Sequence, residues 1–291
     1  MKMYFNQKLK NAVWAVSLTV GLIIILIPIV TGLYLPEAPY LIPLSQRTNN
    51  VFALGLLIAF AFPALVEFNN FTWDRQVDKN IPKLLRDITE TVRSGMTLPK
   101  AIEEASQRNY GPISAELEHT ISMFNMGASF EDSIMSLAQR LRRPTALRFC
   151  TILVEAHQTG GKLIDVLNAS VSLFSSLEEN KEEQYTNMKP YMMTMYMTTM
   201  IFLVMSYIML HQFLGPMYAT STNASTETSG LLTGVLDINY YTSLLFWASL
   251  IESIFAGLIL GKIVDRVLPA GLRHSVILAV ITLVFFNIHV G

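Results

Sequence analysis

Five long apolar runs constrain this chain more than any other feature of its sequence. They cover approximately residues 12–33, 51–66, 191–214, 240–260 and 275–290. About 20 apolar residues cross the roughly 30 Å hydrocarbon core of a bilayer, and a single segment satisfies its backbone there only as a helix. The sequence therefore predicts an all-α, polytopic membrane protein with about five transmembrane helices.

The charged residues are concentrated between the second and third apolar runs. Of the 43 Asp, Glu, Lys and Arg residues, 30 lie between residues 69 and 189. This is the charge density of an ordinary soluble domain, although the whole chain is only 15% charged. We therefore expect an N-terminal membrane region with two transmembrane helices (1–68), a water-exposed helical bundle (69–189) and a C-terminal membrane region with three transmembrane helices (190–291).

The basic residues predict the orientation of the chain, because loops rich in Lys and Arg stay in the cytoplasm. Twenty of the 21 Lys and Arg residues lie in the N-terminal segment, in residues 69–189 or in the turn between the last two runs. In the loops 34–50 and 215–239, Arg47 is the only Lys or Arg residue. We therefore expect a multi-pass protein of the cell membrane whose N-terminus and residues 69–189 are cytoplasmic.

Glycines recur at a nearly fixed period within the charged region. Gly95, Gly127 and Gly160 are 32 and 33 residues apart, and a large apolar residue follows each of them after three and after seven positions. This pattern is typical of a helix that ends at a left-handed glycine and of an amphipathic helix that begins after a tight turn. We interpret these glycines and Gly161 as structural turn residues.

Breaks that contain proline divide each of these repeats into two helices. Together with the glycine turns they predict a six-helix bundle with helices at approximately 77–94, 98–108, 113–126, 130–141, 144–159 and 162–188. Thr97 and Ser129 stand where a side chain can cap the start of a helix. Because the loops are short, successive helices should be antiparallel neighbours.

The sequence lacks the residue patterns of catalytic and cofactor sites. Gly160-Gly161-Lys162 does not form a phosphate-binding loop, because Ala156 stands where that loop requires its first glycine. The five histidines are scattered, and the one cysteine, Cys150, lies in an amphipathic helix where burial is expected. A net charge of −1 does not suit a nucleic-acid partner. We therefore expect no enzymatic activity, no cofactor, no metal site and no nucleic-acid partner.

Two features of the apolar runs have more than one interpretation. Glu252 lies near the middle of the fourth run, where a carboxylate is costly and is by default a functional candidate. It either contacts a partner helix or sits protonated and hydrogen-bonded between helices of this chain. Nine of the 15 methionines lie between Met188 and Met217. They form either an adaptable packing face for another membrane helix or a copper(I) conduit.

Four motifs in the charged region resemble, in their order, those of a known family. They are Arg93-Ser-Gly-Met-Thr-Leu98 within residues 81–105, Tyr110-Gly-Pro-Ile113, Met126-Gly-Ala-Ser-Phe-Glu-Asp-Ser-Ile134 and Glu155-Ala-His-Gln-Thr-Gly-Gly-Lys-Leu-Ile-Asp-Val-Leu167. With these motifs, residues 74–200 resemble the type II secretion system F-domain family, and most of all its archaeal and Tad-type branches.

The resemblance implies a platform protein at the base of a type IV pilus-like machine, such as an archaeal pilus, an archaellum or a related protein secretion system. It implies a cytoplasmic secretion ATPase as partner in trans, and pilin-like subunits that pass beside the platform from the membrane lipid into the filament. Many archaellum platforms contain two such domains, so a single domain implies a homodimer or a heterodimer with a paralogue.

The same resemblance suggests which residues make these contacts. The candidates for ATPase docking are charged residues of the bundle: Arg86, Arg93, Arg142 and Arg143. Glu252 and the methionine-rich third run are the candidates for intramembrane contact with pilin helices.

Two other classes of membrane protein remain alternatives. A membrane transporter or soft-metal conduit requires several polar or ionisable residues inside its spans, whereas only Glu252 lies deep in one. A membrane-anchored docking or regulatory protein requires only a binding domain, and five spans exceed what anchoring needs.

Overall fold

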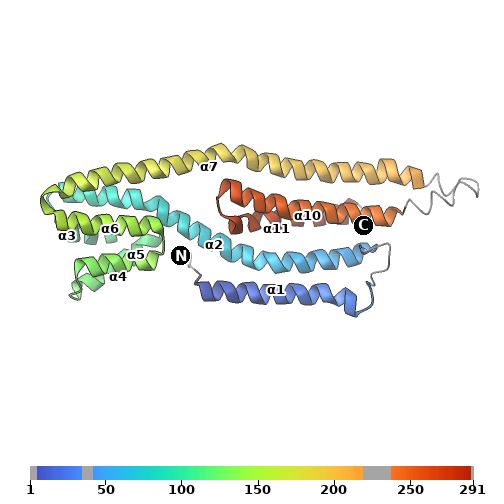
Figure 1. The fold of residues 1–291 in the computed structure, drawn as a ribbon, viewed down its shortest axis with the longest axis horizontal. Coiled ribbons are helices and arrows are strands. Elements are labelled where there is room, and N and C mark those ends of the chain that lie inside the picture. Colours follow the sequence, from blue (N-terminus) through green and yellow to red (C-terminus); the bar gives the residue numbers. More distant parts are fainter. Residues whose placement is uncertain (1–4, 35–41, 219–236, 290–291) are drawn as a thin grey trace, which may run out of the picture. The chain divides into compact units, whose positions relative to one another are not determined.

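The computed structural model describes residues 5–34, 42–218 and 237–289, and every regular element within these ranges is a helix (Figure 1). The long helices are α1 (Gln7–Val30), α2 (Gln46–Arg93), α7 (Leu163–Ile208), α10 (Ile238–Val264) and α11 (Leu272–His289). The short helices are α3 (Leu98–Ser106), α4 (Pro112–Asn125), α5 (Phe130–Leu141) and α6 (Pro144–Thr159). The 3₁₀ turns η1 (Gly160–Lys162) and η3 (Leu268–Gly271) precede α7 and α11, and the π-helical stretch η2 (Met209–Leu214) follows α7. The predicted all-α fold is confirmed.

The described residues belong to two compact units. Asn69–Thr186 form the unit that we call the bundle unit. The described residues up to Phe68 and from Asn187 onward form the span unit. Only α2 and α7 contribute residues to both units among the described helices.

Five of the described helices are long and apolar enough to cross a membrane, which confirms the predicted number. They are α1, α2, α7 with its π-helical continuation, α10, and α11 with the turn before it. The apolar runs of α2 and α7 lie in the span unit. The charged residues of the bundle unit therefore stand outside the spanning parts of these two helices.

The second and third spans are parts of longer helices, which differs from the prediction. We predicted bundle helices at 77–94 and 162–188, but α2 and α7 continue from the bundle unit into the apolar runs without a break. Residues 67–76 of α2 contain no glycine or proline. In α7, Pro190 lies inside the helix, and the Thr194 hydroxyl donates to its carbonyl oxygen at 3.0 Å. Neither junction carries a turn that ends a helix.

An apolar stripe on α2 forms the centre of the bundle unit. Its members recur every three or four residues, as one face of a helix requires. They are Trp73, Val77, Ile81, Leu84, Leu85, Ile88 and Val92, all buried. Apolar side chains of α3 to α6 and of the first turns of α7 join this core, among them the fully buried Phe149.

The turns after α2 and α4 have the same backbone structure. Gly95 and Gly127 have φ angles of +102° and +99°, a region that glycine enters without a Cβ penalty. In each turn the glycine N–H donates to the carbonyl three residues earlier, and the next N–H donates to the carbonyl five residues earlier. This is a Schellman motif. Gly160, with φ of +61°, instead opens the 3₁₀ turn η1 together with Gly161.

The two predicted helix caps behave differently. The Ser129 hydroxyl accepts a hydrogen bond from the Asp132 backbone N–H at 3.0 Å, so Ser129 caps α5 as predicted. Thr97 precedes α3, but its side chain makes no capping hydrogen bond. The capping role predicted for the Thr97 hydroxyl is therefore wrong.

Small residues allow close helix packing in the span unit. On α10, Gly257 and Gly261 approach Ser275 and Gly271 so closely that neither glycine leaves room for a Cβ atom. The Ser275 hydroxyl donates to the Ile254 carbonyl oxygen at 2.8 Å. Contacts of this kind are a usual packing device between membrane helices, where the surrounding lipid supplies no hydrophobic drive.

Candidate functional site

The four arginines predicted to dock an ATPase lie in two groups within the bundle unit. Arg86 and Arg93 form the first group, exposed on α2. The Arg93 Nη2 atom donates to Asn168 Oδ1 at 2.7 Å, and the Arg86 Nη2 atom lies 3.5 Å from Ser175 Oγ. Both arginines therefore take part in the contact between α2 and α7.

The contact between α2 and α7 in the bundle unit is antiparallel. Residue numbers fall on α7 as they rise on α2 along a series of polar and stacking pairs. The pairs are Arg75–Tyr185, Lys79–Glu182, Arg86–Ser175 and Arg93–Asn168. Exposed pairs of this kind contribute little energy one by one, but together they fix the register of the two helices.

Arg142 and Arg143 form the second group, at the turn between α5 and α6. Arg142 ends α5 with a φ of +52° and is exposed. Arg143 extends to α2, where its Nη2 atom donates to Asp78 Oδ2 at 2.7 Å and its Nη1 atom lies 3.4 Å from Asp74 Oδ2. The two neighbouring arginines thus have different surroundings.

Asp78 joins three segments of the bundle unit. Its side chain is only 10% exposed and accepts a second contact from the Lys181 ammonium of α7, at 3.3 Å. Burial by itself would raise the pKa of Asp78, but Arg143 and Lys181 outweigh burial and lower it. At Asp74 burial prevails, and the pKa of that carboxyl is raised in spite of Arg143.

The two groups of arginines do not form one site. Arg143 meets α2 at Asp78, which stands 8 residues before Arg86 and 15 residues before Arg93 on the same helix. At a rise of 1.5 Å per residue, Arg86 and Arg93 lie about 12 Å and about 22 Å from Asp78 along α2. The two groups are therefore separate candidate surfaces.

Glu252 lies on α10 at the border between a buried and an exposed face. Ser249 and Ser253 beside it are buried, whereas Phe255 and Ile259 are 59% and 43% exposed. The Oε2 atom of Glu252 is buried and has no hydrogen-bond partner among the described residues. Because an unsatisfied carboxyl oxygen in apolar surroundings is costly, Glu252 remains a candidate for contact with a group outside this chain.

The methionine-rich part of α7 has one exposed and one buried face. Met193, Met197, Met200 and Met205 are 46% to 63% exposed, whereas Leu203 on the opposite side is fully buried. Their spacing places the four methionines on one side of the helix. This side is available to lipid or to another membrane helix.

A polar network at the turn between α10 and α11 was not predicted. Arg273 donates through Nη2 to Asp265 Oδ2 at 2.8 Å and through Nε to His274 Nε2 at 3.1 Å. The Nδ1 atom of His274 lies 2.8 Å from the Tyr196 hydroxyl on α7. Arg273 and Tyr196 thus contact the two ring nitrogens of His274. The sequence indicates this network only through the charged residues that lie between the fourth and fifth apolar runs.

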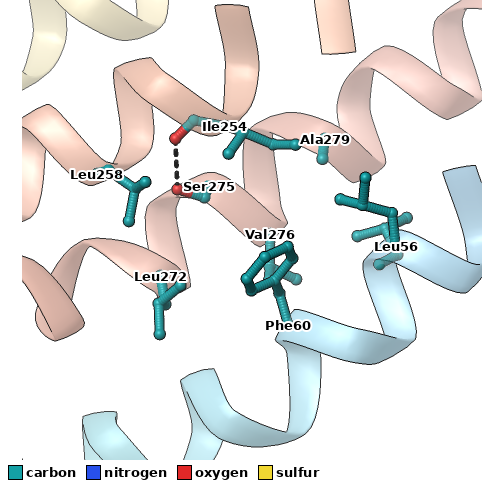
Figure 2. Close-up of a pocket in the computed structure, with 9 residues that line it drawn as sticks. Leu56, Phe60, Ile254, Leu258, Leu272, Ser275, Val276 and Ala279 are labelled. Atoms are coloured by element: carbon teal, nitrogen blue, oxygen red, sulfur yellow. Dashed lines mark hydrogen bonds between the residues drawn. The ribbon is translucent and has the colours of Figure 1, made fainter. Parts of the chain in front are cut away.

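The span unit also contains a small apolar cavity of about 30 Å³ (Figure 2). Leu56 and Phe60 of α2 line it beside Val276 of α11. The Ser275 hydroxyl at its wall is already bonded to the Ile254 carbonyl oxygen. A cavity of this size is far below the volume of a small-molecule site.

The described residues contain no group of three or more His, Cys, Asp or Glu side chains placed to hold a metal ion. Cys150 is fully buried in α6, and burial raises the pKa of its thiol to about 12. The thiol is therefore protonated at neutral pH and does not act as a nucleophile there.

Comparison with known proteins identifies a family domain in part of the chain. Residues 84–211 match the family model for type II secretion system (T2SS), protein F. An uncharacterized protein of Methanocaldococcus jannaschii is 26% identical to this chain over 237 residues. That match covers 81% of this chain and 38% of the relative, so the chain spans less than two fifths of the relative's length. No solved structure matches the chain. The family match extends from the second half of the α2 stripe through α7, so this part of the chain is a type II secretion system F domain.

Proposed function

We propose that this protein is an integral membrane platform protein of a type IV pilus-like or type II secretion-like assembly machine, such as that of an archaeal pilus or archaellum. It couples a cytoplasmic secretion ATPase to the assembly of pilin-like subunits. The observation that carries the proposal is the family match over residues 84–211 in a chain with five candidate spans.

In this proposal the N-terminus and residues 69–189 are cytoplasmic, between membrane regions formed by residues 1–68 and 190–291. The one-sided distribution of Lys and Arg supports this orientation. The ATPase then has direct access to the bundle unit.

The proposed role is structural and not enzymatic. The sequence contains no nucleotide-binding loop, so ATP hydrolysis belongs to the partner. The continuity of α2 and α7 supports a coupling role, because each is one helix with residues in both units. A hydrogen-bonded helix resists bending and therefore transmits a displacement along its axis.

On the membrane side, Glu252 and the exposed methionines of α7 contact the helices of pilin-like subunits. The unpartnered Oε2 atom of Glu252 and the exposed face of α7 support this assignment. A second copy of the chain or a paralogue completes the platform.

Co-purification tests the ATPase contact. The chain is expressed with the secretion ATPase of the same genome, either as Arg86→Glu/Arg93→Glu or as Arg142→Glu, and equal amounts of membrane protein are compared. The double variant removes one candidate surface and Arg142→Glu the other, so the variant that loses the ATPase identifies the docking surface. ATPase recovery at the wild-type level from both variants would contradict docking at these arginines.

Filament assembly tests the membrane contact. Glu252→Gln keeps the size of the side chain but removes its charge, so we expect fewer filaments at an unchanged protein level. Wild-type filament numbers in Glu252→Gln would remove Glu252 from the proposed contact.

A further inference from the structure

We propose that the ion pair between Arg143 and Asp78 is a latch on the α2–α7 pair. A carboxylate-rich segment of the docking partner opens this latch by competing for Arg143. The inference rests on the proposed function for the identity of the partner, whereas the latch itself is a property of this chain alone.

The turn between α5 and α6 carries the surface on which such a segment would bind. Arg142 and Arg148 are exposed, and Leu147 between them in the sequence is 48% exposed. The Arg143 side chain is 30% exposed, so its guanidinium can be reached from this surface. Guanidinium groups bind carboxylates through paired hydrogen bonds, which makes the surface complementary to a segment with several carboxylates and an apolar side chain.

Asp78 connects the α5–α6 turn to both α2 and α7. The carboxylate belongs to α2, Arg143 reaches it from the turn, and Lys181 reaches it from α7. Its low exposure makes the loss of a partner expensive, because a buried charge would be left poorly compensated. Arg143 is the closer of the two cations, at 2.7 Å against 3.3 Å for Lys181.

The balance of charge around Asp78 explains why losing Arg143 would loosen the helix pair. Arg143 contacts Asp74 and Asp78, and Lys181 contacts Asp78 and Glu178. Withdrawal of Arg143 removes the closer of the two cations that contact Asp78. Asp78 and Glu178 then carry like charges on the two facing helices, and the contact between α2 and α7 weakens.

The latch has a direct consequence for the proposed machine. Both helices that it holds are the ones that extend into the span unit. Docking on the turn would therefore change how firmly α2 and α7 are held to each other in the bundle unit. Arg142 and Arg148 bind the partner in this account, and Arg143 is a positioning residue that responds to it.

Hydrogen–deuterium exchange of the full chain in lipid nanodiscs tests the latch without any partner. Arg143→Gln should raise the exchange rate of segments 74–82 and 178–186 at least about fivefold. These segments contain Asp78 and Lys181, and loss of the buried ion pair makes their local opening less costly in free energy. Lys79→Gln is the matched control, since it breaks the pair with Glu182 on the same two helices. That pair is exposed at 63% and 55%, and we expect a change of less than about twofold.

Asp78→Asn is a second variant, which keeps the size of the side chain and should raise exchange in the same two segments. Far-UV circular dichroism shows whether each variant retains its helices. Exchange in Arg143→Gln and Asp78→Asn that does not exceed the Lys79→Gln level would overturn the latch.

A ten-residue glutamate peptide tests the trigger. It should raise exchange of the two segments in the wild-type chain but not in Arg142→Gln/Arg148→Gln, and a ten-residue lysine peptide should have no effect. If the glutamate peptide leaves the exchange rates of the two segments unchanged in the wild-type chain, the competition step is overturned. If the ATPase still co-purifies in that case, the proposed function stands and only this inference fails. If the ATPase fails to bind the wild-type chain but the peptide opens the latch, the proposed function fails and the inference stands.

Discussion

The backbone of Gly257 on α10 lies directly against the backbone of Ser275 on α11. A Cβ atom added to Gly257 would overlap the Ser275 backbone nitrogen and α-carbon. One turn further along α10, Gly261 approaches Gly271 in the same way. The α10–α11 hairpin therefore depends on glycines that allow its two main chains to touch.

Gly257→Ala should destabilise this hairpin. The added methyl group meets backbone atoms that cannot rotate away, and overpacking of this kind costs about 1–3 kcal/mol. Thermal unfolding in detergent, followed by circular dichroism, measures the change. Gly215→Ala is the control, because the nearest atom to an added Cβ there is 3.4 Å away. Equal melting temperatures for the two variants would contradict the close approach.

The two Schellman glycines should respond to substitution for a conformational reason. Nothing lies within 4 Å of an added Cβ at Gly95 or Gly127, so only the positive φ opposes alanine. We expect Gly95→Ala and Gly127→Ala each to lower the free energy of unfolding by about 1–2 kcal/mol. Asparagine tolerates a positive φ better, so Gly95→Asn should cost less than Gly95→Ala. The opposite order in urea denaturation would show that φ is not the cause.

The two predicted caps give a contrasting pair of variants. Ser129→Ala removes the hydrogen bond to the Asp132 N–H and should cost about 1 kcal/mol. Thr97→Ala removes no side-chain cap bond and should be close to neutral. Urea denaturation of the two variants in the same detergent compares them directly, and a larger loss in Thr97→Ala would contradict the observed cap geometry.

The bounds of the short helices could be predicted because their signals are local. The predicted helix at 130–141 coincides with α5, since Gly127 ends the helix before it and Ser129 caps its start. Pro144 likewise marks the start of α6. The continuity of α2 and α7 from the bundle unit into the apolar runs was not predicted, because a junction without a stop signal gives no local reason to end or to continue a helix.

The role of individual charged residues could not be predicted from local signals. Arg142 and Arg143 are neighbours of the same residue type, and Arg143 is the one that contacts Asp78. That carboxylate lies 65 residues away in the sequence, so the packing of α6 against α2 and not a local signal brings Arg143 to it. The network around His274 was missed for the same reason, since Tyr196 is 78 residues distant.

Asp78 gives the bundle unit a pH dependence with a defined sign. The pKa of Asp78 is lower in the folded chain than the value of about 3.9 expected in the unfolded chain, so its ionised form stabilises the fold. This contribution is fully present above about pH 5 and is lost as the pH falls toward the folded pKa. Burial raises the pKa of Asp74, so at this carboxyl the folded chain binds a proton more readily, and stability increases as the pH falls toward about 4.

Thermal unfolding between pH 3 and pH 7 separates the two contributions when Asp78→Asn and Asp74→Asn are compared with the wild type. Asp78→Asn should be less stable than the wild type at pH 7, and the difference should shrink below about pH 4, where the wild type loses the same ionised group. Asp74→Asn should remove the gain in stability on mild acidification but retain the loss at lower pH. A difference between wild type and Asp78→Asn that stays constant from pH 7 to pH 3 would contradict a stabilising, ionised Asp78 held by Arg143 and Lys181.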